Sequence, residues 1–137
     1  MAAAASRSTG RPVIAGTSLG GLAAAYVAMT APQEFSCVLA QSGSFWWPAP
    51  PDGEPEWLTR QFGKRPQLPL RFYVDVGDRE TVRPVAEGLD VRTVSRRFRD
   101  VLVERGYPVT YAEYSGWHDY INWRRTFADG LLALIGR

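Results

Sequence analysis

The stretch "PVIAGTSLGGLAAAYVAM", residues 12–29, decides the fold of this chain. A short β-branched strand, predicted over 11–16, ends in glycine, and a small, apolar helix follows almost at once. Ser18 therefore stands alone between Gly16 and Gly20 where a strand turns into a helix. So sharp a turn strains its central residue, and flanking glycines avoid a steric clash. The pattern is G-x-S-x-G in the context that a nucleophile elbow requires.

Strands and helices alternate along the rest of the chain. Strands are predicted over 11–16, 36–41, 70–77 and 108–114, and helices over 20–30 and from Asp90 to Gly106. A last helix is predicted to carry Trp123, Phe127, Leu131, Leu134 and Ile135. Residues 42–69 are rich in proline and predict a long loop with one short helix near 57–62. Because the strands are almost continuously apolar, we expect a parallel sheet covered by helices on both faces. The predicted fold class is α/β.

Composition limits the kinds of function. The 137 residues suit one compact domain, with 45% hydrophobic and 22% charged residues and a formal net charge of +2. Basic residues are interspersed with acidic ones, so neither a nucleic-acid surface nor a nucleic-acid partner is predicted. No apolar run approaches the roughly 20 residues that span a bilayer. The only cysteine, Cys37, lies in an apolar run and predicts core packing and a reducing, cytoplasmic setting.

A serine hydroxyl needs a base before it can act as a nucleophile near neutral pH, and histidine is the usual base. The chain has a single histidine, His118, in "SGWHDY" directly after the fourth predicted strand. The carboxyl ends of parallel strands meet at one edge of the sheet, so Ser18 and His118 are expected to approach each other. The order serine, acid, histidine along the chain is that of the elbow fold.

The acid is expected at the end of the intervening strand, in "FYVDVGDRE". Asp75 lies inside this strand and is better suited to a local bond or to facing a helix. Asp78 and Glu80 both lie in the turn after Gly77, where a side chain can reach an imidazole. Position alone leaves these two carboxylates as alternatives.

Three stretches resemble one known family: "VIAGTSLGGLAAAYVA", "FSCVLAQSGSFWW" and "YSGWHDYINWR". They are similar to the catalytic domain of the enterochelin esterases, within the esterase D group of α/β-hydrolases. The resemblance runs from about residue 11 to the C-terminus and begins at the family's central strand. It implies a partial α/β-hydrolase fold over 11–137 that lacks the N-terminal strands, with 1–10 as a disordered or junction segment.

The resemblance also implies roles for individual residues. Ser18 would be the nucleophile and His118 the base of a serine carboxylester hydrolase that forms an acyl-enzyme. The family's acid commonly stands three residues after the glycine that ends its strand, which favours Glu80 over Asp78. The backbone N–H of Leu19 would stabilise the oxyanion. No metal and no cofactor is implied.

Aromatic residues surround this predicted site. Trp46 and Trp47 follow the second strand and are expected to form flat walls for an aryl or catecholate group, as in a ferric catecholate siderophore ester. The alternative is that one or both of them cover the core beneath the long loop. Trp117 and Trp123 flank the histidine and are expected to pack around its loop.

The short sheet suggests two further expectations. The strand before Ser18 would lack a neighbour on one side, and such an edge favours self-association. The family's second oxyanion donor comes from a loop before the central strand. An alternative to the esterase is therefore an inactive α/β-hydrolase fragment that acts at most as a binding or assembly module.

Overall fold

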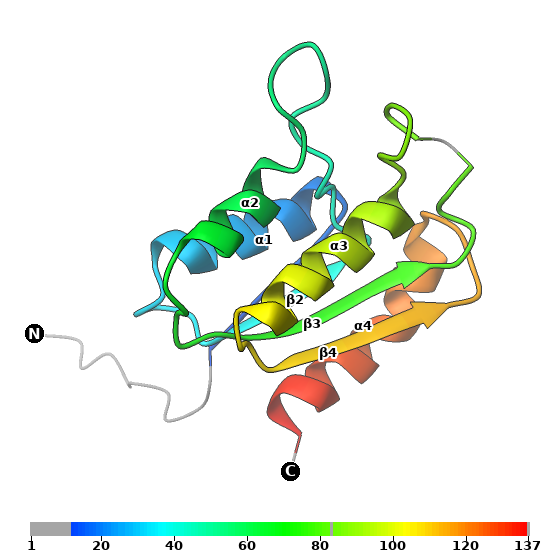
Figure 1. The fold of residues 1–137 in the computed structure, drawn as a ribbon. Helices are drawn as coiled ribbons and strands as arrows, with labels where there is room; N and C mark the ends of the chain where they lie inside the picture. Colours follow the sequence, from blue (N-terminus) through cyan, green and yellow to red (C-terminus); the bar gives the residue numbers. More distant parts are fainter. Residues whose placement is uncertain (1–11, 83, 137) are drawn as a thin grey trace, which may run out of the picture.

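A single parallel sheet organises the molecule (Figure 1). The computed structural model describes residues 12–82 and 84–136. Its strands are β1 (Val13–Thr17), β2 (Cys37–Gln41), β3 (Arg71–Gly77) and β4 (Val109–Tyr114), and they lie in the sheet in sequence order. All three strand pairs are parallel, so each connection has to cross back along the sheet. The predicted α/β class is confirmed.

Helices cover both faces of the sheet. They are α1 (Leu19–Thr30), α2 (Trp57–Lys64), α3 (Val91–Glu104) and α4 (Tyr120–Ile135). Helix α1 packs on β1 and β2, α3 packs on β3 and β4, and α2 lies against α3, all on one face (Figure 1). On the other face, α4 packs mainly on β2 and β3. Because both faces are covered, all five residues of β2 are buried, as its apolar sequence predicted.

The core divides between these two faces. The larger cluster lies under α1, α2 and α3 and centres on aromatic side chains, with Phe62, Phe72 and Phe98 in edge-to-face contact. The smaller cluster lies under α4 and contains Leu39 and Leu134. The predicted core position of Cys37 is confirmed, because its side chain is fully buried in the smaller cluster.

Local signals at the ends of α3 act as predicted. The Asp90 carboxylate accepts a hydrogen bond from the Thr93 N–H at 2.9 Å, which satisfies one of the free donors of the first turn. Gly106 follows the helix with a φ of +85°, a left-handed conformation that glycine adopts without a steric penalty. The predicted short helix also exists as α2, two residues longer than expected.

Strand β1 forms one edge of the sheet and, among the described residues, pairs only with β2. Its central residue, Ala15, is exposed on the face where α4 covers the neighbouring strands. The predicted segment 1–10 lies outside the described residues. Within the described part of the chain, no helix combines the length and apolar character needed to cross a membrane.

Candidate active site

The turn between β1 and α1 holds Ser18 in a strained conformation, with a φ of +55° and a ψ of −123°. Its N–H donates to the Gln41 carbonyl at 2.9 Å, which ties the turn to the end of β2. A Cβ on Gly16 would lie 2.1 Å from the Gly20 carbonyl oxygen, so only glycine fits there. The same expectation for Gly20 is wrong, because a Cβ on Gly20 meets nothing within 4 Å.

Three side chains from different strand ends form one hydrogen-bonded chain. Ser18 Oγ lies 2.9 Å from His118 Nε2, and His118 Nδ1 lies 2.6 Å from Glu80 Oε2. The Glu80 side chain is 1% exposed, whereas the His118 side chain is 39% exposed at the mouth of a pocket. The parallel sheet therefore brings together a hydroxyl, an imidazole and a carboxylate that lie far apart in the sequence.

Asp78 and Glu80, which their positions in the sequence left as alternatives for the acid, make different contacts. Glu80 reaches the imidazole, and its N–H donates to the Gly77 carbonyl, so the turn folds back over the end of β3. Asp78 instead accepts from the Gly116 N–H at 3.0 Å and so braces the loop that carries the histidine. The Gly77 Cα lies so close to this loop that a Cβ there would be 2.4 Å from the Gly116 carbonyl oxygen.

Asp75 lies below the site and faces α4, as its place inside the strand suggested. Gln41 Nε2 donates to its carboxylate at 3.4 Å and to Thr126 Oγ1 at 2.7 Å. The side chain is fully buried, and this burial raises the pKa of Asp75 to about 6. No ion pair compensates this carboxylate among the described residues, and its Oδ1 has no hydrogen-bond partner there.

The far oxygen of the Glu80 carboxylate has its own set of donors. Glu80 Oε1 accepts from Ser42 Oγ at 2.6 Å, from the Gly77 N–H at 2.8 Å and from the Tyr114 hydroxyl at 3.3 Å. Burial is the main cause that raises the pKa of Tyr114, so its hydroxyl stays a proton donor. The sequence analysis assigned no role to Ser42 or Tyr114, although both lie in stretches that carry the family resemblance, "FSCVLAQSGSFWW" and "YSGWHDYINWR".

A pocket of about 520 Å³ opens at the serine and the histidine. Its lining residues are Ser18, Ser44, Trp46, Arg79, Glu80, Val82, Val91, Trp117 and His118. Trp117 is 48% exposed, and the Arg79 guanidinium lies 5.6 Å from its ring centroid. The expected packing role is therefore wrong for Trp117. It is confirmed for Trp123, which is buried and meets the His118 ring edge-on with 4.8 Å between ring centroids.

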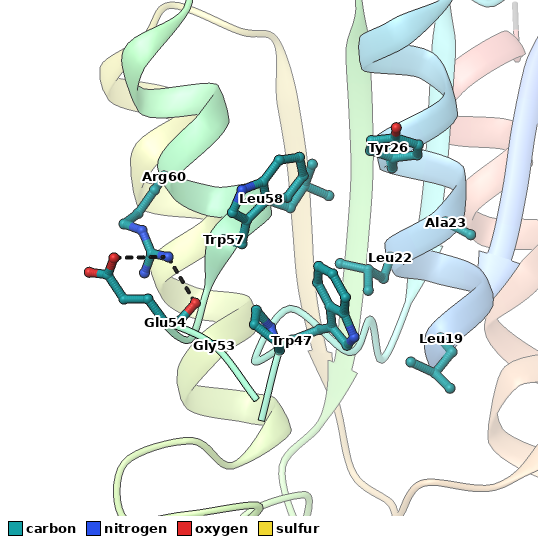
Figure 2. A pocket seen from close by; sticks show the side chains of 11 residues that line it. Leu19, Leu22, Ala23, Tyr26, Trp47, Gly53, Glu54, Trp57, Leu58 and Arg60 are labelled. Carbon is teal, nitrogen blue, oxygen red and sulfur yellow. Dashed lines mark hydrogen bonds and ion pairs between the residues drawn. The ribbon is translucent and has the colours of Figure 1, made fainter. Parts of the chain in front are cut away.

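A second pocket, also of about 520 Å³, lies between α1 and α2. Figure 2 shows Leu19, Leu22 and Tyr26 on the α1 side and Trp57 on the α2 side, with Trp47 between them. Arg60 and Glu54 form an ion pair at the rim. The structure thus divides the tryptophan pair, since Trp46 lines the pocket of Ser18 and Trp47 lines the neighbouring one.

Leu19 is the first residue of α1, directly after the strained serine. Its N–H has no acceptor among the described residues, whereas the Ser18 carbonyl accepts from Gly21, Leu22 and Ser44. A helix N-terminus carries a partial positive charge, so this free donor can stabilise a developing negative charge. In residues 12–82 and 84–136, no group of three His, Cys, Asp or Glu side chains is arranged to hold a metal ion.

Comparisons with known proteins identify the family of this chain. The Esterase family model, described as "Putative esterase", matches residues 2–134. The iron(III) enterobactin esterase of Dickeya dadantii is 35% identical, and the match covers 91% of this chain and 29% of that protein. The iron(III) salmochelin esterase of Escherichia coli is 32% identical over 92% of this chain and 31% of its own length. The chain thus spans about 30% of the length of these relatives.

Solved structures of esterases and related hydrolases are similar to this chain in fold. The enterobactin esterase of Shigella flexneri in the presence of 2,3-di-hydroxy-N-benzoyl-serine is 29% identical, with a TM-score of 0.74 over 88% of this chain and 30% of that chain. An S-formylglutathione hydrolase from Agrobacterium tumefaciens is 18% identical, with a TM-score of 0.70 over 90% of this chain and 48% of its own, and so shares the fold.

Proposed function

The chain belongs to the Esterase family, and we propose that it carries the catalytic machinery of a serine carboxylester hydrolase. The observation that supports this most directly is the continuous hydrogen-bonded chain Ser18 Oγ, His118 Nε2, His118 Nδ1, Glu80 Oε2. Such a chain lets an imidazole take the hydroxyl proton while a carboxylate stabilises the imidazolium that forms.

In the proposed reaction, Ser18 Oγ attacks the ester carbonyl carbon and its proton passes to His118 Nε2. The carbonyl oxygen becomes an oxyanion, to which the Leu19 N–H donates. When the tetrahedral intermediate collapses, the bond to the alkoxy group breaks and His118 returns the proton to the leaving alcohol. Water then repeats the sequence on the acyl-Ser18 ester, releasing the acid and restoring the hydroxyl.

We propose an ester with an aryl group, of the catecholate siderophore kind, as the substrate. The relatives of this chain are named for enterobactin and salmochelin, and one solved relative was studied with a dihydroxybenzoyl compound. In this chain, Trp46 and Trp117 offer flat apolar surfaces beside Ser18, and Arg79 adds a positive charge at the same pocket. The apolar pocket around Trp47 is suited to a second aryl group of the same molecule.

The first prediction concerns covalent labelling of the purified chain with a fluorophosphonate probe. The wild type is expected to form a stable adduct, because the probe reacts with a serine that an adjacent base has activated. Ser18→Ala should abolish labelling, and His118→Ala should slow it by at least about a thousand-fold. Ser95→Ala removes a buried hydroxyl on α3 and serves as the matched control that labels normally.

The alternative proposal is that the chain is a binding or assembly module without turnover. The chain matches about 30% of the length of its relatives, so their activity does not by itself establish turnover by this chain. Turnover depends strongly on the oxyanion donors, since removing one donor costs roughly 100- to 1,000-fold. A folded wild-type chain that does not label would support this alternative and contradict the esterase.

A further inference from the structure

Ser42 lies directly after β2 and is completely buried. Its φ of +48° lies in the left-handed region, which residues other than glycine seldom occupy. The Ser42 N–H donates to the Asp75 carbonyl at 2.8 Å, so the end of β3 holds the backbone in this conformation. A serine that is kept at a conformation better suited to glycine indicates that the hydroxyl has a use.

The hydrogen bonds of the Ser42 hydroxyl have a defined direction. Trp123 Nε1 lies 2.9 Å from Ser42 Oγ, and an indole N–H can only donate. Ser42 Oγ is therefore the acceptor in this bond, and it donates its single proton to Glu80 Oε1 at 2.6 Å. An ionised carboxylate only accepts, which agrees with this direction. The Tyr114 hydroxyl also lies 3.1 Å from Ser42 Oγ, and because the Ser42 proton is engaged with Glu80, any hydrogen bond between these two hydroxyls is donated by Tyr114. The hydrogen bonds thus run in one direction: the Trp123 indole N–H donates to the Ser42 hydroxyl, and the Ser42 hydroxyl donates to the Glu80 carboxylate.

The direction of these hydrogen bonds affects which nitrogen of the His118 imidazole carries the proton. Glu80 Oε1 is occupied by its donors, and Oε2 faces His118 Nδ1 at 2.6 Å, where a carboxylate oxygen can only accept a hydrogen bond. Nδ1 is then the protonated nitrogen, and the free lone pair of Nε2 faces Ser18 Oγ at 2.9 Å. The buried donors on the far side of the carboxylate thereby select the tautomer that a general base needs.

Trp123 links the same two groups from the other side. Its ring packs edge-on against the His118 ring, with an interplanar angle of 86°, while its N–H holds Ser42. One buried side chain of α4 therefore orients both the imidazole and the hydroxyl that fixes the carboxylate.

We infer that Ser42, held by the Trp123 indole N–H, is a positioning residue that keeps Glu80 Oε2 against His118 Nδ1. Ser42 is completely buried, makes no hydrogen bond to Ser18 or His118 among the described residues, and is proposed to act through Glu80. The inference rests on the proposed function for its effect on catalysis. The part of the inference that concerns structure, the orientation of the Glu80–His118 pair, can be measured without turnover.

The test uses the fact that His118 is the only histidine in the chain, so its ring protons are assigned without ambiguity in a proton NMR spectrum. A short, charge-assisted bond at Nδ1 predicts a far-downfield resonance in the wild type. Ser42→Gly removes the hydroxyl and relaxes the backbone, because glycine favours a φ of +48°. We expect this variant to fold and the resonance to move upfield or to be lost through exchange.

The matched control is again Ser95→Ala, which removes a buried hydroxyl that makes no hydrogen bond among the described residues. It should leave the resonance unchanged. Tyr114→Phe removes the longer of the two hydroxyl contacts to Glu80 Oε1, together with the 3.1 Å contact between the Tyr114 and Ser42 hydroxyls, and leaves the Ser42–Glu80 bond in place. It should therefore give a smaller shift than Ser42→Gly. A Ser42→Gly spectrum with the wild-type resonance would overturn the inference.

Activity gives the second readout. With the fluorophosphonate probe, Ser42→Gly should lower the labelling rate by about ten- to a hundred-fold, the usual cost of a misplaced catalytic group. If the wild type does not label but its resonance depends on Ser42, the proposed function fails and the positioning role stands. If the wild type labels and Ser42→Gly labels equally fast, the positioning role fails and the proposed function stands.

Discussion

At the scale of single residues, the two glycines around Ser18 have different physical roles. A Cβ on Gly16 would collide with a backbone carbonyl that cannot move without opening the turn, whereas Gly20 has open space around its Cα. The motif makes both glycines look equally necessary. Only the distances in the folded chain distinguish a steric requirement from a position where glycine is tolerated.

The prediction at this scale compares Gly16→Ala with Gly20→Ala. Gly16→Ala should lower the free energy of unfolding by about 1–3 kcal/mol, the usual cost of overpacking, and should abolish labelling because Ser18 moves. Gly20→Ala should be neutral or raise the free energy of unfolding by about 0.4–1 kcal/mol, since glycine weakens a helix. Thermal unfolding and probe labelling check both, and equal effects of the two substitutions would contradict this account.

At the scale of elements, the packing of α4 on β2 and β3 encloses a carboxylate. Asp75 lies in the middle of this contact, and burial raises its pKa to about 6, partly offset by bonds from Thr126 and Gln41. In the unfolded chain its pKa would return to the ordinary value of 3.8. Between these two values, the folded state binds a proton that the unfolded state has already lost.

The free energy of unfolding is therefore expected to fall as the pH rises from about 4 to about 6, by up to about 1.4 kcal/mol per pH unit from this group. Well above pH 6, Asp75 is deprotonated in both the folded and the unfolded chain, so its contribution to the free energy of unfolding no longer changes with pH. Asp75→Asn should remove this part of the pH dependence of the free energy of unfolding, as measured by chemical denaturation at pH 4, 5, 6 and 7. The slope here is the change in that free energy per pH unit. Glu34→Gln, which changes an exposed carboxylate, is the control that should keep the slope. Identical slopes for the wild type and Asp75→Asn would exclude Asp75 as the source.

At the scale of the whole molecule, the two edges of the sheet differ. Strand β4 carries Glu113, which is paired with Arg96, and such edge charges discourage pairing with another chain. Strand β1 has the sequence VIAGT, without a charge, and exposes Ala15. The predicted self-association through β1 remains a prediction, and this asymmetry supports it.

Sedimentation velocity over a range of concentrations tests this prediction. The wild-type chain is expected to associate as its concentration rises, and Ala15→Lys is expected to shift it toward the monomer, because a lysine discourages pairing at an edge. Thr110→Lys places the same charge at an exposed position on β4 and should leave the association unchanged. A wild type that is monomeric at every concentration would rule out the edge contact.

By itself, the sequence determined the order of the elements and the residues at the strand ends. Local features of the sequence predict both: apolar runs, a strand that ends at glycine, the Asp90 cap, and the glycines that flank Ser18. Because parallel strands end at one edge, the chain order of serine, acid and histidine also predicted which residues would approach each other. These predictions needed no knowledge of any distance.

Only the tertiary structure decided which atoms meet. Glu80 contacts the imidazole while Asp78 braces the loop, because the turn after Gly77 folds back over the end of β3. The neighbours Trp46 and Trp47 line different pockets. The network of Ser42 and Trp123 joins residues 81 positions apart through a backbone conformation that no local pattern encodes. Contacts of this kind depend on the packing of α4 against the sheet, so they exist only in the folded chain.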